Sequence, residues 1–106
     1  MIRGIRAAAV LLLAASIAGP AFAQAPGADT YKAKCAMCHG ADGLATSQMA
    51  KNMKILSFKD PAMIKATDAQ LFASTKNGKG TMKGYDGKLT DAQINDLVSF
   101  IRTLQK

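Results

Sequence analysis

The chain has 106 residues and a formal net charge of +7, and all seven of its acidic residues are Asp. A chain of this length forms one small domain, which buries too little surface to be very stable without additional help. Its two cysteines lie three residues apart, which excludes the framework of several disulfides that small exported domains often use. We therefore expect a large apolar group from outside the chain to complete the core.

Residues 1–23 have the features of a cleaved secretory signal peptide. Arg3 and Arg6 precede an apolar run over residues 7–18, and residues 21–23, Ala-Phe-Ala, form a small-x-small cleavage pattern. The run is well short of the roughly 20 residues that span a bilayer, which argues against a membrane anchor. This pattern predicts export with cleavage after residue 23.

Cleavage after Ala23 leaves residues 24–106 as a single domain, and an alternative cut after Ala25 changes little. The loss of Arg3 and Arg6 lowers the net charge from +7 to +5. We expect this domain to be a periplasmic monomer without a membrane anchor. Outside the cytoplasm, nucleic acid is not an expected partner for its basic surface.

The first predicted helix of the mature chain begins at Asp29, a residue type that caps helix N-termini. It continues to His39 and ends at residues 40–43, because glycine there permits the left-handed conformation that closes a helix. Residues 44–59 have only loosely helical spacing and no clear boundary. Residues 59–61, Lys-Asp-Pro, predict a turn.

Two later helices both begin with the letters TDAQ. Thr67 with Gln70, and Thr90 with Gln93, fit the capping box in which each side chain bonds the other residue's backbone. The first of these helices is expected to run to about Thr75. The second carries an apolar stripe at helical spacing: Ile94, Leu97, Val98, Ile101 and Leu104. No segment alternates as a strand does, so the predicted fold class is all-α.

Residues 35–39, Cys-Ala-Met-Cys-His, carry the clearest chemical signal. On a helix, residues three apart share a face with Cβ atoms roughly 5–6 Å apart, so the thiols of Cys35 and Cys38 can each add to a vinyl group of one haem. The next residue, His39, is then carried under the iron as a nitrogen ligand, and it is the only histidine of the chain. The motif predicts one covalently bound haem c.

Other sites built on C-x-x-C fit this sequence less well. A structural zinc ion takes four ligands, whereas Cys35, Cys38 and His39 supply three. A thioredoxin-like disulfide belongs beside a βαβ unit, and no strand is predicted here. A purely structural disulfide would close a very small loop and add little stability.

Met82 is the candidate for the second axial ligand of the iron. It lies in the glycine- and lysine-rich segment 76–88, which has no core of its own, and three glycines around it would let the backbone fold over a flat ring. Met37 lies inside the attachment helix on the side of the histidine. Three further methionines sit among apolar residues, where methionine usually fills a core: Met49, Met53 and Met63. The alternative for Met82 is a loop residue that touches the surface.

Three stretches of the chain resemble the class I c-type cytochromes: YKAKCAMCHGADG, KNGKGTM and YDGKLTDAQINDLVSFIRTL. The resemblance implies the cytochrome c fold, with three to five short helices wrapped around one haem. By position, it makes Cys35 and Cys38 the thioether cysteines, His39 the proximal ligand and Met82 the distal one. The family often has Pro after the ligand methionine, where this chain has Lys83.

The same resemblance assigns structural roles to three aromatic residues. The last helix is expected to pack across the first, with Phe100 at the crossing. Phe58 and Tyr85 are expected to contact the haem ring.

A haem with protein ligands on both faces has no free position for a substrate, so we expect one-electron transfer between respiratory or dehydrogenase partners rather than catalysis.

The basic residues of the domain suggest how it docks to these partners. Lysines near the Met82 segment and the attachment site would steer an acidic partner to the haem edge: Lys34, Lys76, Lys79, Lys83 and Lys88. The alternative is an ordinary solvated surface.

Two other functions remain open at the level of sequence. If Met82 does not bind the iron, the open sixth position suits a peroxidase-like enzyme or a ligand sensor. The domain is also suited to be a fixed electron-transfer subunit of a periplasmic dehydrogenase.

Overall fold

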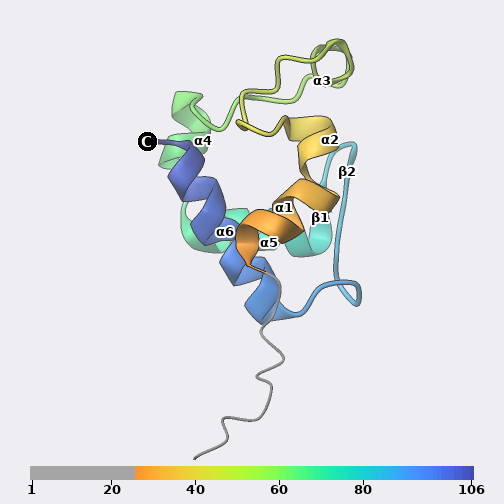
Figure 1. The fold of residues 1–106 in the computed structure, drawn as a ribbon, viewed down its shortest axis with the longest axis vertical. Helices are drawn as coiled ribbons and strands as arrows, with labels where there is room; N and C mark the ends of the chain where they lie inside the picture. The colour runs from red at the N-terminus through yellow and green to blue at the C-terminus, as the bar shows by residue number, and fades with distance from the viewer. Residues whose placement is uncertain (1–25) are drawn as a thin grey trace, which may run out of the picture.

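The structure is a computed structural model that describes residues 26–106 (Figure 1). The predicted signal peptide, residues 1–23, and both predicted cleavage sites lie outside the described residues. Within the described part, no helix is both long and apolar enough to cross a membrane. The elements in chain order are α1 (Gly27–Lys34), α2 (Ala36–His39), α3 (Gln48–Asn52), α4 (Pro61–Lys65), α5 (Asp68–Asn77), β1 (Gly78–Lys79), β2 (Met82–Lys83) and α6 (Asp91–Leu104).

This mostly helical architecture confirms the expected fold class, with two differences in detail. The six helices of residues 26–106 exceed the expected three to five, because the first predicted helix is divided at Cys35 into α1 and α2. The segment of Met82, expected as a loop, contains the antiparallel pair β1–β2. Each of these strands is only two residues long, too short to show an alternating pattern.

Helix α1 begins before Asp29, the predicted cap, and that prediction is wrong. Pro26 occupies the N-cap position and makes no side-chain cap bond, while Asp29 lies in the first turn. There its carboxylate is placed favourably against the positive end of the helix dipole. The acidic residue therefore stabilises the helix from inside the first turn.

Both predicted capping boxes are present. Thr67 accepts from the backbone N–H of Gln70 at 3.1 Å, and the Gln70 side chain accepts from the backbone of Thr67 at 2.9 Å. Thr90 and Gln93 make the same reciprocal pair at the start of α6, at 3.2 and 2.9 Å. The local sequence thus fixes where the two longest helices begin.

The core is built around α6, which crosses α1 and α5 (Figure 1). Leu104 of its predicted apolar stripe is half-buried. The other four residues of the stripe are buried: Ile94, Leu97, Val98 and Ile101. Phe100 lies at the crossing as expected, with its ring centroid 5.0 Å from that of Tyr31. The sides of α1 and α5 that face away from this crossing, together with α2, are available to form a binding site.

The ambiguous segment 44–59 contains one five-residue helix, α3, and a second one, α4, directly follows it; each has its own cap. Ser47 caps α3 by accepting from the N–H of Ala50 at 3.0 Å. Asp60 caps α4 by accepting from the N–H of Ala62 at 2.9 Å, with Pro61 at the first helical position. The predicted Lys-Asp-Pro turn is present and leads directly into α4. The N–H of Asp60 donates to the carbonyl of Ser57 at 3.0 Å, and the helix begins at Pro61, a residue type favoured at the first helical position.

Candidate haem site

A cavity of about 1250 Å³ lies among α1, α2, the segment from Met53 to Ala66, α5 and the β1–β2 hairpin. This is larger than the roughly 300–1,000 Å³ typical of small-molecule pockets. Its wall is mostly apolar. It includes all four predicted site residues and both predicted ring contacts: Cys35, Cys38, His39, Met82, Phe58 and Tyr85. The cavity is the missing part of the core that the short sequence led us to expect.

Cys35, between α1 and α2, and Cys38, within α2, both line this cavity, and both thiols are free. Burial, and then the neighbouring Cys38, raise the pKa of the Cys35 thiol to about 11. Cys35 is therefore a neutral, buried thiol at neutral pH. Two cysteines at this spacing beside one large apolar cavity fit a group attached through two thioether bonds.

His39 ends α2 and also lines the cavity. Burial lowers the pKa of its imidazole, which favours the neutral form that binds metals. Its Nδ1 atom is buried and has no hydrogen-bond partner among the described residues. The ring of Phe58 stacks on the imidazole, with centroids 4.8 Å apart and planes 18° apart.

The donor set fits the iron of a haem better than a bare metal ion. Within residues 26–106, no group of three or more His, Cys, Asp or Glu side chains could hold a metal ion by itself. A single imidazole and thioether sulfurs around one cavity are instead the axial ligands found in cytochromes c. This argues against the zinc interpretation of the motif.

The positions of the methionines only partly match the prediction. Met82 is half-buried and lines the cavity from β2, but Met53 and Met63 line it as well. Met63 also packs against the core as expected, whereas Met49 is 40 % exposed and is not a core residue. Met37 is 82 % exposed. Three methionines therefore line the cavity.

The glycines around Met82 have a role in the hairpin itself. A Cβ on Gly78 would lie 2.6 Å from the carbonyl oxygen of Met82, and one on Gly84 would lie 2.6 Å from that of Lys76. Gly80 has a φ of 58° at the first position of the two-residue turn, as a type II′ hairpin turn requires. These residues allow β1 and β2 to fold tightly against the end of α5.

The lysines at the cavity only partly match those predicted for docking. Lys34, Lys79 and Lys83 line the cavity, whereas Lys76 pairs with Asp91 at 3.0 Å and Lys88 lies elsewhere. Two lysines of the middle segment, Lys54 and Lys65, line it in their place. No pattern in the sequence indicated these two lysines, because the path of residues 44–66 was not predictable.

A comparison with protein families matches residues 22–101 to the family described as cytochrome c oxidase, cbb3-type, subunit III. The chain belongs to this family of c-type cytochromes. The prediction of a small class I c-type cytochrome is thereby confirmed. Its covalently bound haem c follows from the family, and Cys35 and Cys38 have the spacing for the attachment.

Sequence relatives include cytochromes c6 and parts of larger subunits. Cytochrome c6 of Limnospira maxima is 32 % identical over 85 residues, covering 73 % of this cytochrome and 88 % of the relative. The cytochrome c subunit of an alcohol dehydrogenase (quinone) from Komagataeibacter europaeus is 33 % identical over 88 residues. That match covers 76 % of this cytochrome but only 19 % of the subunit. These relatives support a c-type haem electron carrier.

Solved structures agree with this assignment. The c-type cytochrome KustC0563 superposes with a TM-score of 0.70 at 25 % identity, covering 76 % of this cytochrome and 99 % of that chain. The c-type cytochrome XoxG of Methylobacterium extorquens AM1 has a TM-score of 0.58 at 24 % identity, covering 74 % and 48 %. The cytochrome c fold is therefore shared over nearly the whole described domain.

Proposed function

We propose that this cytochrome is a periplasmic one-electron carrier with His39 and Met82 as the axial ligands of its haem. The observation that carries the proposal is the single cavity that brings Cys35, Cys38 and His39 together with Met82, which lies 43 residues after His39. The N-terminal signal pattern supports export.

Electron transfer follows from the filled coordination. With the imidazole of His39 and the thioether of Met82 both bound to it, the iron would have no free position for a substrate, oxygen or peroxide. His/Met ligation also raises the reduction potential relative to other ligand sets. The residues of the chain then have three tasks: they hold the ring, exclude water from it and keep both ligands in place.

The basic residues at the cavity support docking to an acidic redox partner. Five lysines from different parts of the fold line it: Lys34, Lys54, Lys65, Lys79 and Lys83. Positive charges gathered around one opening steer an acidic surface towards it, and the gain in rate falls as salt screens the charges. This set keeps three of the five lysines expected from the sequence, with Lys54 and Lys65 in place of Lys76 and Lys88.

A fixed subunit of a dehydrogenase is the second candidate function. The observation in its favour is the similarity to one part of the cytochrome c subunit of alcohol dehydrogenase (quinone). Size-exclusion chromatography of a periplasmic extract at low salt separates the two candidates. A free carrier elutes at the mass of a monomer, whereas a fixed subunit elutes with a dehydrogenase.

The far-red absorption spectrum of the ferric protein tests the ligation. We expect a sulfur-to-iron band that only high concentrations of imidazole remove, and its loss together with a lower potential in Met82→Ala. Met53→Leu and Met63→Leu are matched controls, since both methionines also line the cavity. Loss of the band in either control would assign the ligand to that residue instead. A parent protein without the band, binding imidazole tightly, would point to an enzyme or sensor.

A further inference from the structure

The backbone around His39 is held firmly. Its N–H donates to the carbonyl of Cys35 at 3.0 Å, and its carbonyl accepts from the N–H of Ala45 at 2.9 Å. The next carbonyl, that of Gly40, accepts from the hydroxyl of Tyr31 at 2.6 Å. These bonds fix the position of the His39 backbone, but they leave the side chain free to rotate about its Cα–Cβ and Cβ–Cγ bonds.

Among residues 26–106, no hydrogen bond fixes the plane of this imidazole. A metal-bound histidine almost always donates its second ring N–H to an acceptor, which sets the orientation of the ring. In His39 the Nδ1 atom is buried, and the described residues offer it no hydrogen-bond partner. Another contact must therefore define the plane.

The ring of Phe58 is in the position to do so. It lies nearly parallel to the imidazole of His39, at 18° and 4.8 Å between centroids, and Phe58 is only 4 % exposed. Rotation of the imidazole out of this plane would drive its edge into the aromatic ring. Because interiors are closely packed, the stack restricts the imidazole as long as Phe58 itself cannot move.

Phe58 is confined on several sides. A Cβ on Gly43 would lie 2.6 Å from Cδ2 of Phe58, so the ring fills the space that this glycine leaves open. The N–H of Phe58 donates to the carbonyl of Gly43 at 2.9 Å. The ring of Tyr31 lies tilted to it, with centroids 6.3 Å apart.

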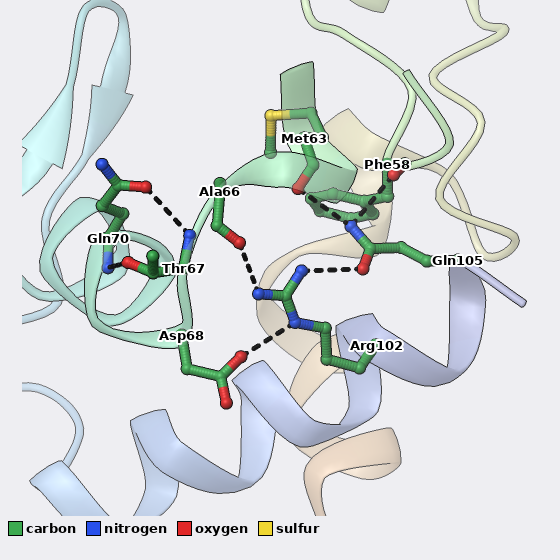
Figure 2. Close-up of polar contacts among 8 residues, drawn as sticks. All are labelled: Phe58, Met63, Ala66, Thr67, Asp68, Gln70, Arg102 and Gln105. Carbon is green, nitrogen blue, oxygen red and sulfur yellow. Dashed lines mark hydrogen bonds and ion pairs between the residues drawn. The ribbon is translucent and has the colours of Figure 1, made fainter. Parts of the chain in front are cut away.

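Gln105, directly after the end of α6, holds the backbone of Phe58 (Figure 2). Nε2 of Gln105 donates to the carbonyl of Phe58 at 3.0 Å and to that of Met63 at 3.3 Å. Nη1 of Arg102 donates to Oε1 of Gln105 at 2.9 Å, so it fixes which end of the amide faces the carbonyls. All the polar atoms of the Gln105 amide are thus used.

Arg102 is anchored in turn to the segment between α4 and α5. Its Nη2 donates to the carbonyl of Ala66 at 2.5 Å, and its Nε pairs with Asp68 at 2.8 Å. Figure 2 shows the guanidinium and the Gln105 amide side by side between α6 and this segment. The two side chains therefore join α6 to the wall of the cavity.

We propose that Phe58 sets the plane of the His39 imidazole, and that Gln105, oriented by Arg102, is the positioning residue that holds Phe58 against it. The proposal rests on the proposed function, because it takes His39 as an axial ligand. The plane of an axial imidazole governs how unpaired electron density is distributed over a ferric haem. The polar contacts at the end of α6 thereby act on the electronic structure of the site from a distance.

Proton NMR of the ferric holoprotein tests this directly, because the shifts of the four haem methyl groups report the ligand plane. Phe58→Leu removes the flat ring. Gln105→Glu keeps the size of the side chain and an acceptor for Arg102, but its carboxylate has no N–H for the carbonyls of Phe58 and Met63. We expect the methyl shifts to move in both variants, more strongly in Phe58→Leu, with a change in reduction potential.

Two matched variants separate positioning from general damage. Lys106→Gln makes the same change of one charge beside Gln105, at an exposed residue. Thr90→Ala removes the cap bond at the opposite end of α6 and lowers stability without touching Phe58. Both should keep the methyl shifts of the parent.

The inference is overturned if Phe58→Leu and Gln105→Glu keep the methyl shifts of the parent, or if Thr90→Ala moves them equally. Failure of the proposed function would be visible earlier, in a parent spectrum without imidazole and sulfur on the iron. A parent with both ligands and unmoved variants would overturn the positioning role alone.

Discussion

The hydroxyl of Tyr85 donates a hydrogen bond to the backbone carbonyl of Lys34 over 3.0 Å, joining residues 51 positions apart. Tyr85 follows the hairpin that carries Met82, and Lys34 directly precedes Cys35. The backbone N–H of Tyr85 also donates to the carbonyl of Thr75 at 3.0 Å. This residue thus ties the segment of the candidate distal ligand to the attachment segment.

Tyr85→Phe should weaken that connection without changing the packing of the ring. We expect a loss of about 0.5–1.5 kcal/mol in the free energy of unfolding, typical of one hydrogen bond. The Met82 segment should also open more readily, so imidazole should displace the sulfur at lower concentration. Urea denaturation and an imidazole titration of the ferric protein measure the two effects. Thr103→Val, which removes a hydrogen bond made by a residue that does not line the cavity, should leave the imidazole titration unchanged.

Gly78 should tolerate alanine far less well than Gly87. Gly78 has φ 83° and ψ 165°, a conformation that only glycine adopts readily, and its added Cβ would lie 2.6 Å from the Met82 carbonyl oxygen. Gly87 also has a positive φ, of 76°, but in the described part of the chain no heavy atom would lie within 4 Å of its Cβ. We expect Gly87→Ala to cost about 1–2 kcal/mol.

The collision at Gly78 should add roughly 1–3 kcal/mol to the backbone cost. Urea denaturation of both alanine variants measures the difference. Gly78→Ala should also weaken the far-red band, because the hairpin holds Met82. Equal losses in the two variants would show that the hairpin moves away from the added methyl group without cost.

Lys54→Gly should stabilise the protein. Lys54 has φ 57° directly after the end of α3, where its N–H donates to the carbonyl of Lys51 and the N–H of Ile55 donates to that of Ala50. This is a Schellman motif, in which glycine is preferred at the left-handed position. Relief of the strain is worth about 1 kcal/mol. Lys51→Gly removes the same charge inside the helix and should instead destabilise, so thermal unfolding of the two variants should shift in opposite directions.

The lysines that line the cavity should matter more for electron transfer than those elsewhere. Lys79→Glu changes a residue of the cavity wall, whereas Lys88→Glu makes the same charge reversal away from it. Stopped-flow reaction with an anionic oxidant at low ionic strength should be slowed by Lys79→Glu on the order of a few-fold more than by Lys88→Glu. The difference should disappear at high salt. Equal slowing would show that net charge alone steers the encounter.

The features that the sequence predicted are those encoded by neighbouring residues. Thr67 with Gln70 is a local signal, and the capping box forms as expected. The apolar stripe of α6 is also local, because the period of a helix places its members on one face. The two cysteines and His39 act within five residues. These patterns are sufficient for the fold class and for the kind of cofactor.

The features that were missed depend on contacts between distant segments. Phe58 stacks on His39 from 19 residues away, and Gln105 reaches Phe58 from 47 residues away. Nothing in the local sequence of residues 44–66 indicates which side chains face the cavity, so Lys54 and Lys65 were overlooked. A polar residue at the end of a helix has many possible partners, and only the packed fold selects one.

Tyr31 should make the protein lose stability at alkaline pH. Burial, and then the nearby Cys35 and Asp42, raise the pKa of its phenol well above the ordinary value of 10.0. In the unfolded chain the phenol ionises near that ordinary value, so stability is retained below pH 10 and falls as the pH rises towards the folded-state pKa. Tyr31→Phe lacks the hydroxyl that bonds the Gly40 carbonyl, so it should be less stable at neutral pH, by about 0.5–1.5 kcal/mol. Because phenylalanine cannot ionise, the gap between parent and variant should narrow above pH 10 in urea denaturation. Lysines titrate in both proteins and cancel in the difference, so parallel curves from pH 8 to 11.5 would contradict the buried, neutral phenol.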